Sequence, residues 1–104
     1  MEIPLMKNNI IHFVNSDDIL YVRSDKHQIT IRTYEGEYHP LRTLHDFQQL
    51  LHFEQVDKSA IIQLKNVTEY DPFHRVVYFR QSSIELRCFV SRRNAQKIKR
   101  HIEH

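Results

Sequence analysis

The sequence predicts a mainly β fold made of small antiparallel sheets, with one short helix in the middle of the chain and a second helix at its C-terminal end. Two observations lead to this prediction. Apolar and polar residues alternate with a period of two through most of the 104 residues, which is typical of strands that are buried on one face. Two other segments repeat their apolar residues at helical spacing.

The alternation is clearest in two stretches. In QITIRTY, Ile29 and Ile31 alternate with polar residues. In IELRCFV, one predicted face is apolar and contains Cys88, whereas the other carries Glu85, Arg87 and Phe89. Strands are also expected in the shorter apolar runs IIHFV, ILYV, AIIQL and RVVYF, which cover 10–14, 19–22, 60–64 and 75–79.

Turn residues separate these strands. The single glycine, Gly36, lies between two strand-like runs, where a hairpin turn requires a positive φ. The DPFH and QSS segments are expected to form two more turns. With one glycine and three prolines, the chain contains no flexible internal linker. We therefore predict a single domain over residues 1–104, in which residues 1–9 form a flexible or linker segment.

Two segments have helical spacing. In TLHDFQQLLH, which begins at Thr43, four apolar residues (Leu44, Phe47, Leu50 and Leu51) recur at intervals of three, three and one, and Thr43 is a suitable N-cap. In the last segment, Ala95, Ile98 and Ile102 form one stripe, and Ser91 is the expected N-cap. These are the central and the C-terminal helix of the prediction.

The absence of several sequence motifs argues against metalloproteins and enzymes. The eight histidines form no zinc-binding motif, and one cysteine cannot build a zinc finger, so no metal is expected. Cys88 is expected to be a small core residue rather than a nucleophile. There is no serine nucleophile elbow, no phosphate loop and no dinucleotide fingerprint. We therefore expect neither a cofactor nor an enzymatic activity.

The same kind of reasoning predicts where the protein acts. No run approaches the roughly 18 apolar residues that a membrane span needs. The first residues, MEIPLMKNN, do not form a signal peptide. A single cysteine rules out an internal disulfide and suits a reducing compartment. A cytoplasmic protein without a membrane partner is the expectation.

Charge is distributed unevenly along the chain. The formal net charge is only +2, but residues 1–50 carry five Lys and Arg against seven Asp and Glu, whereas residues 51–104 carry ten against six. Residues 87–104 alone carry six Lys and Arg, and Arg87 is the first of them. Such a gradient suits a polyanionic partner, although a basic helix at a chain end also occurs in proteins without one.

Three polar clusters lie at the ends of predicted strands. They are SDKHQ, which begins at Ser24, the start of VDKSAIIQLKN, which begins at Val56, and SRRN, which begins at Ser91. Taken singly, each is more simply a solvated turn, and SRRN a helix cap. Taken together, they share lysine and arginine for phosphates, histidine and arginine for base edges, and serine and asparagine for hydrogen bonds to phosphates.

The order of these segments resembles the LytTR DNA-binding domain, the effector module of many bacterial response regulators. The resemblance covers roughly Ile10 to His104 and is most specific over Phe53–Val67. There Phe53, Ser59, Ile61, Ile62 and Val67 match the family pattern, and Ser91 and Arg92 match it near the end of the chain. Lys58 stands where arginine is usual, and Gln55, Asp57 and Gln63 depart from the pattern.

The resemblance implies an elongated fold of small sheets in series, whose loops read bases in successive major grooves of double-stranded DNA. By position, His27 and Arg93 would contact base edges, and Lys58 would contact DNA. Ser59, Gln63 and Arg92 would support the contacts to the DNA backbone. The predicted DNA-binding set is completed by Lys26 and Asn94.

The resemblance also implies a role and partners. The chain would be the effector domain of a two-component transcriptional regulator and would bind DNA with repeated half-sites. A receiver domain would precede it if the chain was cut from a longer regulator. No long apolar heptad pattern is present, so we expect a monomer in the absence of DNA and pairs of copies on DNA.

Two other functions fit the sequence. One is a protein-interaction module that uses strand edges and the basic C-terminal helix, whose binding would be insensitive to salt. The other is an RNA-binding domain, which would need exposed aromatic side chains for stacking on bases. Phe73, Tyr78 and Phe89 are the candidates for such stacking, although core packing is the expected use of most of them.

Overall fold

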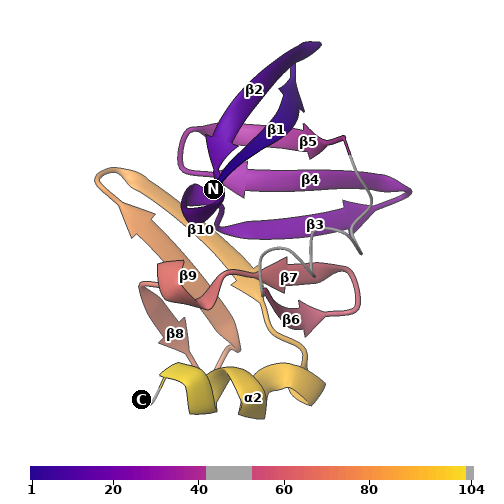
Figure 1. Ribbon diagram of the computed structural model, residues 1–104. Helices are drawn as coiled ribbons and strands as arrows, with labels where there is room; N and C mark the ends of the chain where they lie inside the picture. Colours follow the sequence, from indigo (N-terminus) through magenta and orange to yellow (C-terminus); the bar gives the residue numbers. More distant parts are fainter. Residues whose placement is uncertain (42–52, 103–104) are drawn as a thin grey trace.

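The computed structural model describes residues 1–41 and 53–102. Within these residues the fold is mainly β, with antiparallel sheets and one α-helix at the C-terminal end (Figure 1), as the sequence predicts. The molecule measures 40 × 30 × 25 Å along its principal axes. The central helix predicted from Thr43 to His52 lies outside the described residues.

The larger sheet has the strand order β2-β1-β5-β4-β3-β7-β6, and all of its strand pairs are antiparallel. Its strands are β1 (Glu2–Lys7), β2 (Ile10–Asn15), β3 (Tyr21–Asp25), β4 (Gln28–Thr33), β5 (Gly36–Pro40), β6 (Glu54–Asp57) and β7 (Ala60–Ile62). The smaller sheet has the order β10-β9-β8, built from β8 (Glu69–Asp71), β9 (Val76–Gln81) and β10 (Ile84–Phe89). The helical elements are η1 (Ser16–Asp18), η2 (Leu64–Asn66) and α2 (Arg92–Ile102).

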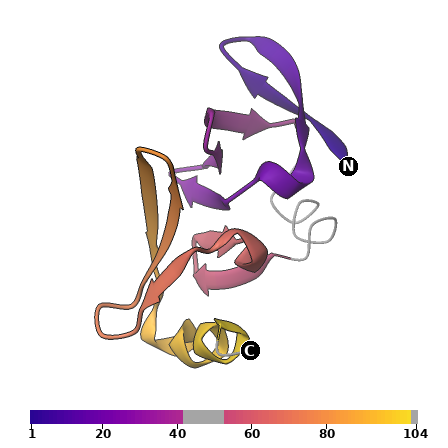
Figure 2. The ribbon, with the colours of Figure 1, turned by 90° about the vertical axis from the view of Figure 1, so that its left-hand side faces the viewer.

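The two sheets pack against each other around β3 and β7, and α2 closes the lower side of the molecule (Figure 2). Cys88 in β10 and Phe79 in β9 are inaccessible or nearly so, as is Ile98 in α2. These side chains share one hydrophobic cluster with residues of β3, β6 and β7. We call this cluster the inter-sheet core; it contains Leu20, Tyr21, Val56, Ile62, Val77, Phe79, Cys88, Val90 and Ile98.

A second hydrophobic cluster lies on the other face of the larger sheet. This cluster, here called the outer core, contains Ile3, Leu5, Ile19, Val22, Ile31, Tyr38 and Ile61. Successive residues of a strand point to opposite faces, so Tyr21 faces the inter-sheet core and Val22 the outer core. Ile62 and Ile61 divide in the same way. At Tyr21–Val22 and Ile61–Ile62, strands β3 and β7 are therefore buried on both faces.

The first residues of the chain correct one expectation. Residues 1–9 were expected to be a flexible or linker segment, but Glu2–Lys7 pairs with β2 along all six residues. Leu5 is completely buried, and its contribution to the outer core holds the segment in place. Pro4 weakens the strand pattern because it lacks a backbone N–H. The pairing is compatible with Pro4 because β5 pairs with β1 only at Leu5 and Met6.

The predicted details of the turns and of the last helix are mostly confirmed. Gly36 has φ +152°, and an added Cβ would lie 2.6 Å from Lys7 Nζ. In β10, Cys88 is buried and Phe89 is exposed, as the alternation predicts. Ile98 is buried on α2, whereas Ile102 is 41% exposed because it lies at the end of the helix. None of the described helices has the length and apolar character needed to cross a bilayer.

The inter-sheet core predicts that replacing Phe79 destabilises the protein much more than replacing Phe73. Phe79 is fully buried, and its ring lies 5.7 Å from that of Tyr21 in the other sheet, whereas Phe73 is 84% exposed. Phe79→Ala is expected to lower the free energy of unfolding by roughly 3–5 kcal/mol because it leaves a cavity between the sheets. Phe73→Ala is expected to change it by less than about 0.5 kcal/mol. Urea denaturation of both variants tests this, and equal effects would contradict the assignment of the core.

Candidate nucleic-acid interface

The turn between β3 and β4 consists of Lys26 and His27, which are both exposed. Both have positive φ values, 47° and 72°. A two-residue hairpin turn of this type favours asparagine and glycine, because other side chains are strained at positive φ. The turn between β1 and β2 meets this requirement with Asn8 and Asn9. The residues at 26 and 27 are therefore not the ones that would best stabilise the turn.

The turn between β6 and β7 consists of Lys58 and Ser59. The carboxylate of Asp57 accepts hydrogen bonds from the backbone N–H of Ser59 at 3.0 Å and from its hydroxyl at 3.4 Å. This Asx-type turn fixes the backbone locally. The Lys58 side chain is exposed at the tip of the turn.

The start of α2 presents two arginines. Ser91 precedes the helix, and its hydroxyl accepts a hydrogen bond of 2.8 Å from the side-chain amide of Asn94. Arg92 and Arg93 are exposed in the first turn, which contains no acidic residue. Cations at this position oppose the helix dipole, which favours an anion there. The Ser91 hydroxyl thus accepts a hydrogen bond from a side chain, whereas an N-cap accepts one from a backbone N–H of the first turn. The segment presents two guanidinium groups to solvent.

Two backbone hydrogen bonds join the three segments. Ser24 N–H donates to Ser59 O at 2.8 Å, and Ser91 N–H donates to Val56 O at 2.8 Å. The three segments project on the same side of the molecule, at the right in Figure 1. We call this surface the basic edge; it comprises the turns Lys26–His27 and Lys58–Ser59 and the first helical turn Arg92–Asn94. The strands that lead into it are anchored by the buried pairs Tyr21–Val22 and Ile61–Ile62.

Arg23 supports the basic edge in a way that the sequence did not indicate. Its Nη2 atom donates to Arg87 O at 2.9 Å and contacts Cys88 Sγ at 3.4 Å, and its guanidinium lies over the Tyr21 ring at 4.8 Å. Burial raises the pKa of the Cys88 thiol, so this thiol is neutral and accepts a weak hydrogen bond. Arg23 therefore ties β10 to β3 across the sheet boundary, a contact between residues 64 positions apart.

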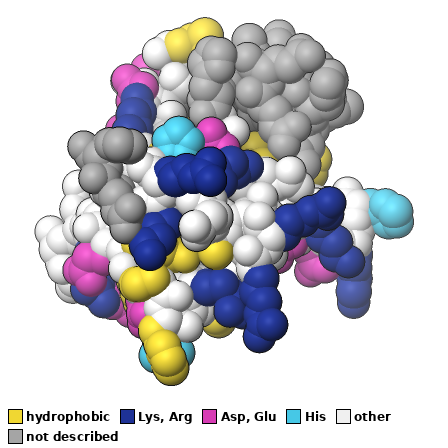
Figure 3. All heavy atoms as spheres, turned by 90° about the horizontal axis from the view of Figure 1, so that it is seen from below, with side chains coloured by type: hydrophobic (Ala, Val, Ile, Leu, Met, Phe, Trp, Pro, Cys, Tyr) yellow, Lys and Arg dark blue, Asp and Glu magenta, His cyan; other side chains and the backbone are white. Residues whose placement is uncertain are grey.

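The cations of the basic edge differ in their partners from five other Lys and Arg residues, which form ion pairs. Among the described residues, no carboxylate forms an ion pair with Lys26, Lys58, Arg92 or Arg93. Elsewhere, ion pairs form between Lys65 and Asp17, Arg32 and Glu37, and Lys97 and Glu54. Figure 3, which views the molecule from the α2 side, shows Lys and Arg side chains gathered on this face and along its right-hand edge. The basic edge is therefore available to an external anion.

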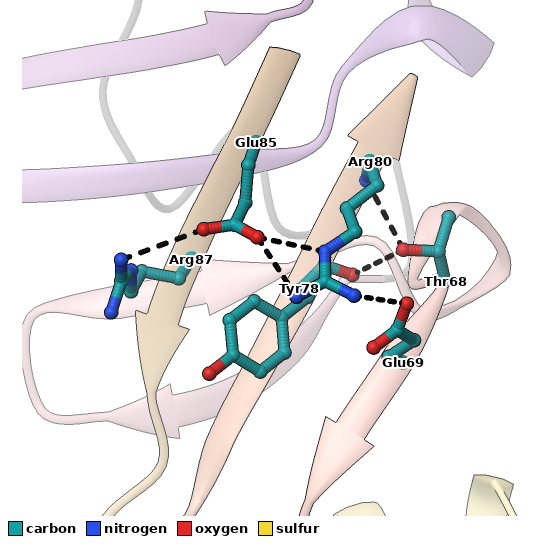
Figure 4. A network of polar contacts seen from close by, with 6 residues as sticks. All are labelled: Thr68, Glu69, Tyr78, Arg80, Glu85 and Arg87. Atoms are coloured by element: carbon teal, nitrogen blue, oxygen red, sulfur yellow. Dashed lines mark hydrogen bonds and ion pairs between the residues drawn. The ribbon is translucent and has the colours of Figure 1, made fainter. Parts of the chain in front are cut away.

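On the smaller sheet, a polar network pairs two arginines with carboxylates, so their charges are less available to an external anion (Figure 4). Arg80 bonds to Glu69 and, at 2.8 Å, to Glu85, while Arg87 lies 3.5 Å from Glu85. The guanidinium groups of Arg80 and Arg87 lie 4.6 and 5.9 Å from the centre of the Tyr78 ring. Arg87, one of the six Lys and Arg among residues 87–104, is thus compensated by an acidic neighbour.

The aromatic candidates for base stacking divide into two groups. Arg80 and Arg87 contact the ring of Tyr78. Phe73 is 84% exposed and Phe89 is 66% exposed. The expectation that core packing is their main use is therefore wrong for both phenylalanines, because Phe73 lies in a surface turn and Phe89 on the outward face of β10.

Gln63 is the one residue of the predicted DNA-binding set that lies apart from the basic edge. It is buried, and its amide donates to Ser16 O at 3.0 Å and to Ile19 O at 2.6 Å. These bonds join the segment after β7 to η1. Within residues 1–41 and 53–102, no three His, Cys, Asp or Glu side chains come together as a metal site requires.

Comparison with known proteins agrees with this geometry. A family model described as the LytTr DNA-binding domain matches residues 9–103. A solved structure, the LytTr DNA-binding domain of a response regulator from Bacillus cereus, is 15% identical in sequence and has a TM-score of 0.76. The match covers 99% of this chain and 97% of that one, which shows a shared fold. No curated protein matches the chain.

The strained turn at 26–27 generates a prediction about stability. The double substitution Lys26→Asn with His27→Gly is expected to raise the free energy of unfolding by roughly 1–2 kcal/mol, because both new residues tolerate positive φ. Urea denaturation measures the change. A matched substitution in the first hairpin, Asn8→Lys with Asn9→His, is expected to lower stability by a similar amount. If the free energy of unfolding does not rise for Lys26→Asn with His27→Gly, the turn at 26–27 is unstrained.

Proposed function

The chain belongs to the LytTR family of DNA-binding domains, and we propose from this premise that it binds double-stranded DNA in a sequence-specific way through the basic edge. The observation that carries the proposal is the presence of four cations without a carboxylate partner among the described residues, on three segments that two backbone hydrogen bonds hold together. Phosphate groups are the anions that such a surface fits best, because a duplex presents them at regular intervals along one face.

The residues of the basic edge are suited to two kinds of contact. Arg93 presents a planar pair of donors that matches guanine O6 and N7, and His27 offers a single hydrogen bond to a base edge. Lys26, Lys58 and Arg92 supply charge to phosphates. Asn94 already donates to Ser91, so its role is to hold the turn that presents the arginines.

The proposal extends to the setting in which the domain acts. The chain serves as the effector domain of a bacterial two-component transcriptional regulator in the cytoplasm and enters the major groove with its loops. Its partners are duplex DNA with repeated half-sites and a receiver domain in the same regulator. The chain is monomeric without DNA, and two copies pair on the DNA.

A second candidate function is protein interaction at β2. This strand is the last in the larger sheet, so one side of its backbone is open to pairing within the described residues. It exposes Ile10, Ile11 and Phe13, with Phe13 71% exposed. Native edge strands usually carry charges that prevent pairing with another chain, and β2 has none. The response of binding to salt separates this function from DNA binding.

The first functional prediction concerns ionic strength. If the cations of the basic edge neutralise phosphates, the logarithm of the association constant should fall linearly with the logarithm of the salt concentration, by about 0.9 for each phosphate contacted. Fluorescence anisotropy with a labelled duplex between low and moderate salt measures this slope. A flat response would favour a protein partner at β2.

The second prediction separates base contacts from phosphate contacts. Arg93→Ala is expected to lower affinity by roughly 1–3 kcal/mol on the preferred duplex and much less on a scrambled duplex, because only the preferred site offers the matching base. His27→Ala should act likewise but less strongly. Lys58→Ala should weaken binding to both duplexes alike. It should also reduce the slope of log affinity against log salt by about one unit.

Binding of each variant to both duplexes decides between these roles. Arg100→Ala is a matched control, since Arg100 is also exposed but lies outside the basic edge, on the third turn of α2. An equal loss on both duplexes for Arg93→Ala would mean that this arginine contacts only the DNA backbone.

A further inference from the structure

Phe89 is an exposed aromatic residue whose two neighbours in the chain are buried. Its neighbours Cys88 and Val90 are 1% and 2% exposed, whereas Phe89 itself is 66% exposed. Its ring is not part of either core cluster. Burying a phenylalanine side chain stabilises a folded protein, whereas leaving it exposed does not. The fold thus gains little from this ring, which remains available to an external partner.

The surroundings of Phe89 place it within the proposed interface. It lines a cavity of about 340 Å³ together with Ser24 and Asp25, which lead into the turn at Lys26–His27. Asp57 and Ser59, which flank Lys58, line the same cavity. Only three residues separate Phe89 from Arg93 in the chain. A duplex that contacts all three segments of the basic edge therefore passes over this ring.

The chemistry of the cavity selects what the ring can contact. The carboxylates of Asp25 and Asp57 line it together with the guanidinium of Arg23. The two negative charges outnumber the one positive charge, so the cavity does not favour a phosphate group, and a base edge is the part of DNA that fits there. Major-groove base edges are polar except for the 5-methyl group of thymine, which makes apolar contacts with side chains such as phenylalanine. An exposed phenyl ring and a methyl group both leave water on contact, which favours their association.

We propose that Phe89 is a specificity-determining residue that contacts the 5-methyl group of a thymine in the major groove, and thereby gives the domain a preference for thymine at one position of its site. The proposal rests on the proposed function of the basic edge. It adds an apolar contact to the polar contacts that Arg93 and His27 make with other bases. It also explains why a phenyl ring stands at an exposed position, which packing within the protein does not explain.

The test uses a change of one methyl group. A preferred duplex is first selected from random sequences, and each thymine in it is then replaced singly by deoxyuridine, which pairs in the same way but lacks the methyl group. The wild-type chain is expected to lose roughly fourfold in affinity at one position, the value for one buried methyl group. Phe89→Ala is expected to bind the thymine and deoxyuridine duplexes equally at that position, and Phe89→Leu to retain part of the difference.

Phe73→Ala is the matched control, because Phe73 is also exposed but does not line the cavity; it should retain the full difference between thymine and deoxyuridine. Urea denaturation confirms that the variants are folded. The inference is overturned if the wild type binds every deoxyuridine duplex as well as the parent, or if Phe89→Ala keeps the wild-type difference. It is also overturned if Phe89→Ala weakens only the binding of single-stranded RNA. If no preferred duplex can be selected at all, the proposed function itself fails, which is a separate result.

Discussion

The burial of β3 and β7 on both faces, at Tyr21–Val22 and Ile61–Ile62, is the constraint on which the rest of the structure depends. Tyr21 and Ile62 belong to the inter-sheet core, whereas their neighbours Val22 and Ile61 belong to the outer core. A shift of one residue in either strand would exchange the two sets, and both cores would then lose their packing. The pairing of Tyr21 with Ile62 and of Val22 with Ile61 is therefore fixed from two sides.

This constraint reaches the surface through the ends of the same two strands. β3 leads into the turn at Lys26–His27, and β7 begins directly after Lys58–Ser59. The inter-sheet core also contains Val90, so the start of α2 is held by the same packing. A site built on such elements keeps its side chains in place better than one on long loops. The basic edge can consequently carry residues that stabilise the fold poorly, such as non-glycine residues at positive φ and arginines in a first helical turn.

The distribution of charge follows the same division between stability and function. On the smaller sheet, Arg80 lies between Glu69 and Glu85, so its charge is satisfied within the protein. On the basic edge, Lys58 and Arg93 have no carboxylate partner among the described residues. Net charge alone did not distinguish these two groups. The distinction matters because only a cation without an internal partner gains fully from a phosphate.

The sequence by itself determined most of the strands, the C-terminal helix and the cations of the basic edge. These follow from local patterns: alternation as in Ile84–Val90, a cap at Ser91, and polar clusters at strand ends. It did not reveal β1, because Pro4 weakens the strand pattern and only pairing with β2 and β5 confirms it. Only the tertiary structure decided that Gln63 is buried, that Arg23 joins β3 to β10, and that the exposed Phe89 lies beside the residues that flank the turns of the basic edge. The physical reason is that these features depend on contacts between residues far apart in the chain, which no local period of two or 3.6 residues encodes.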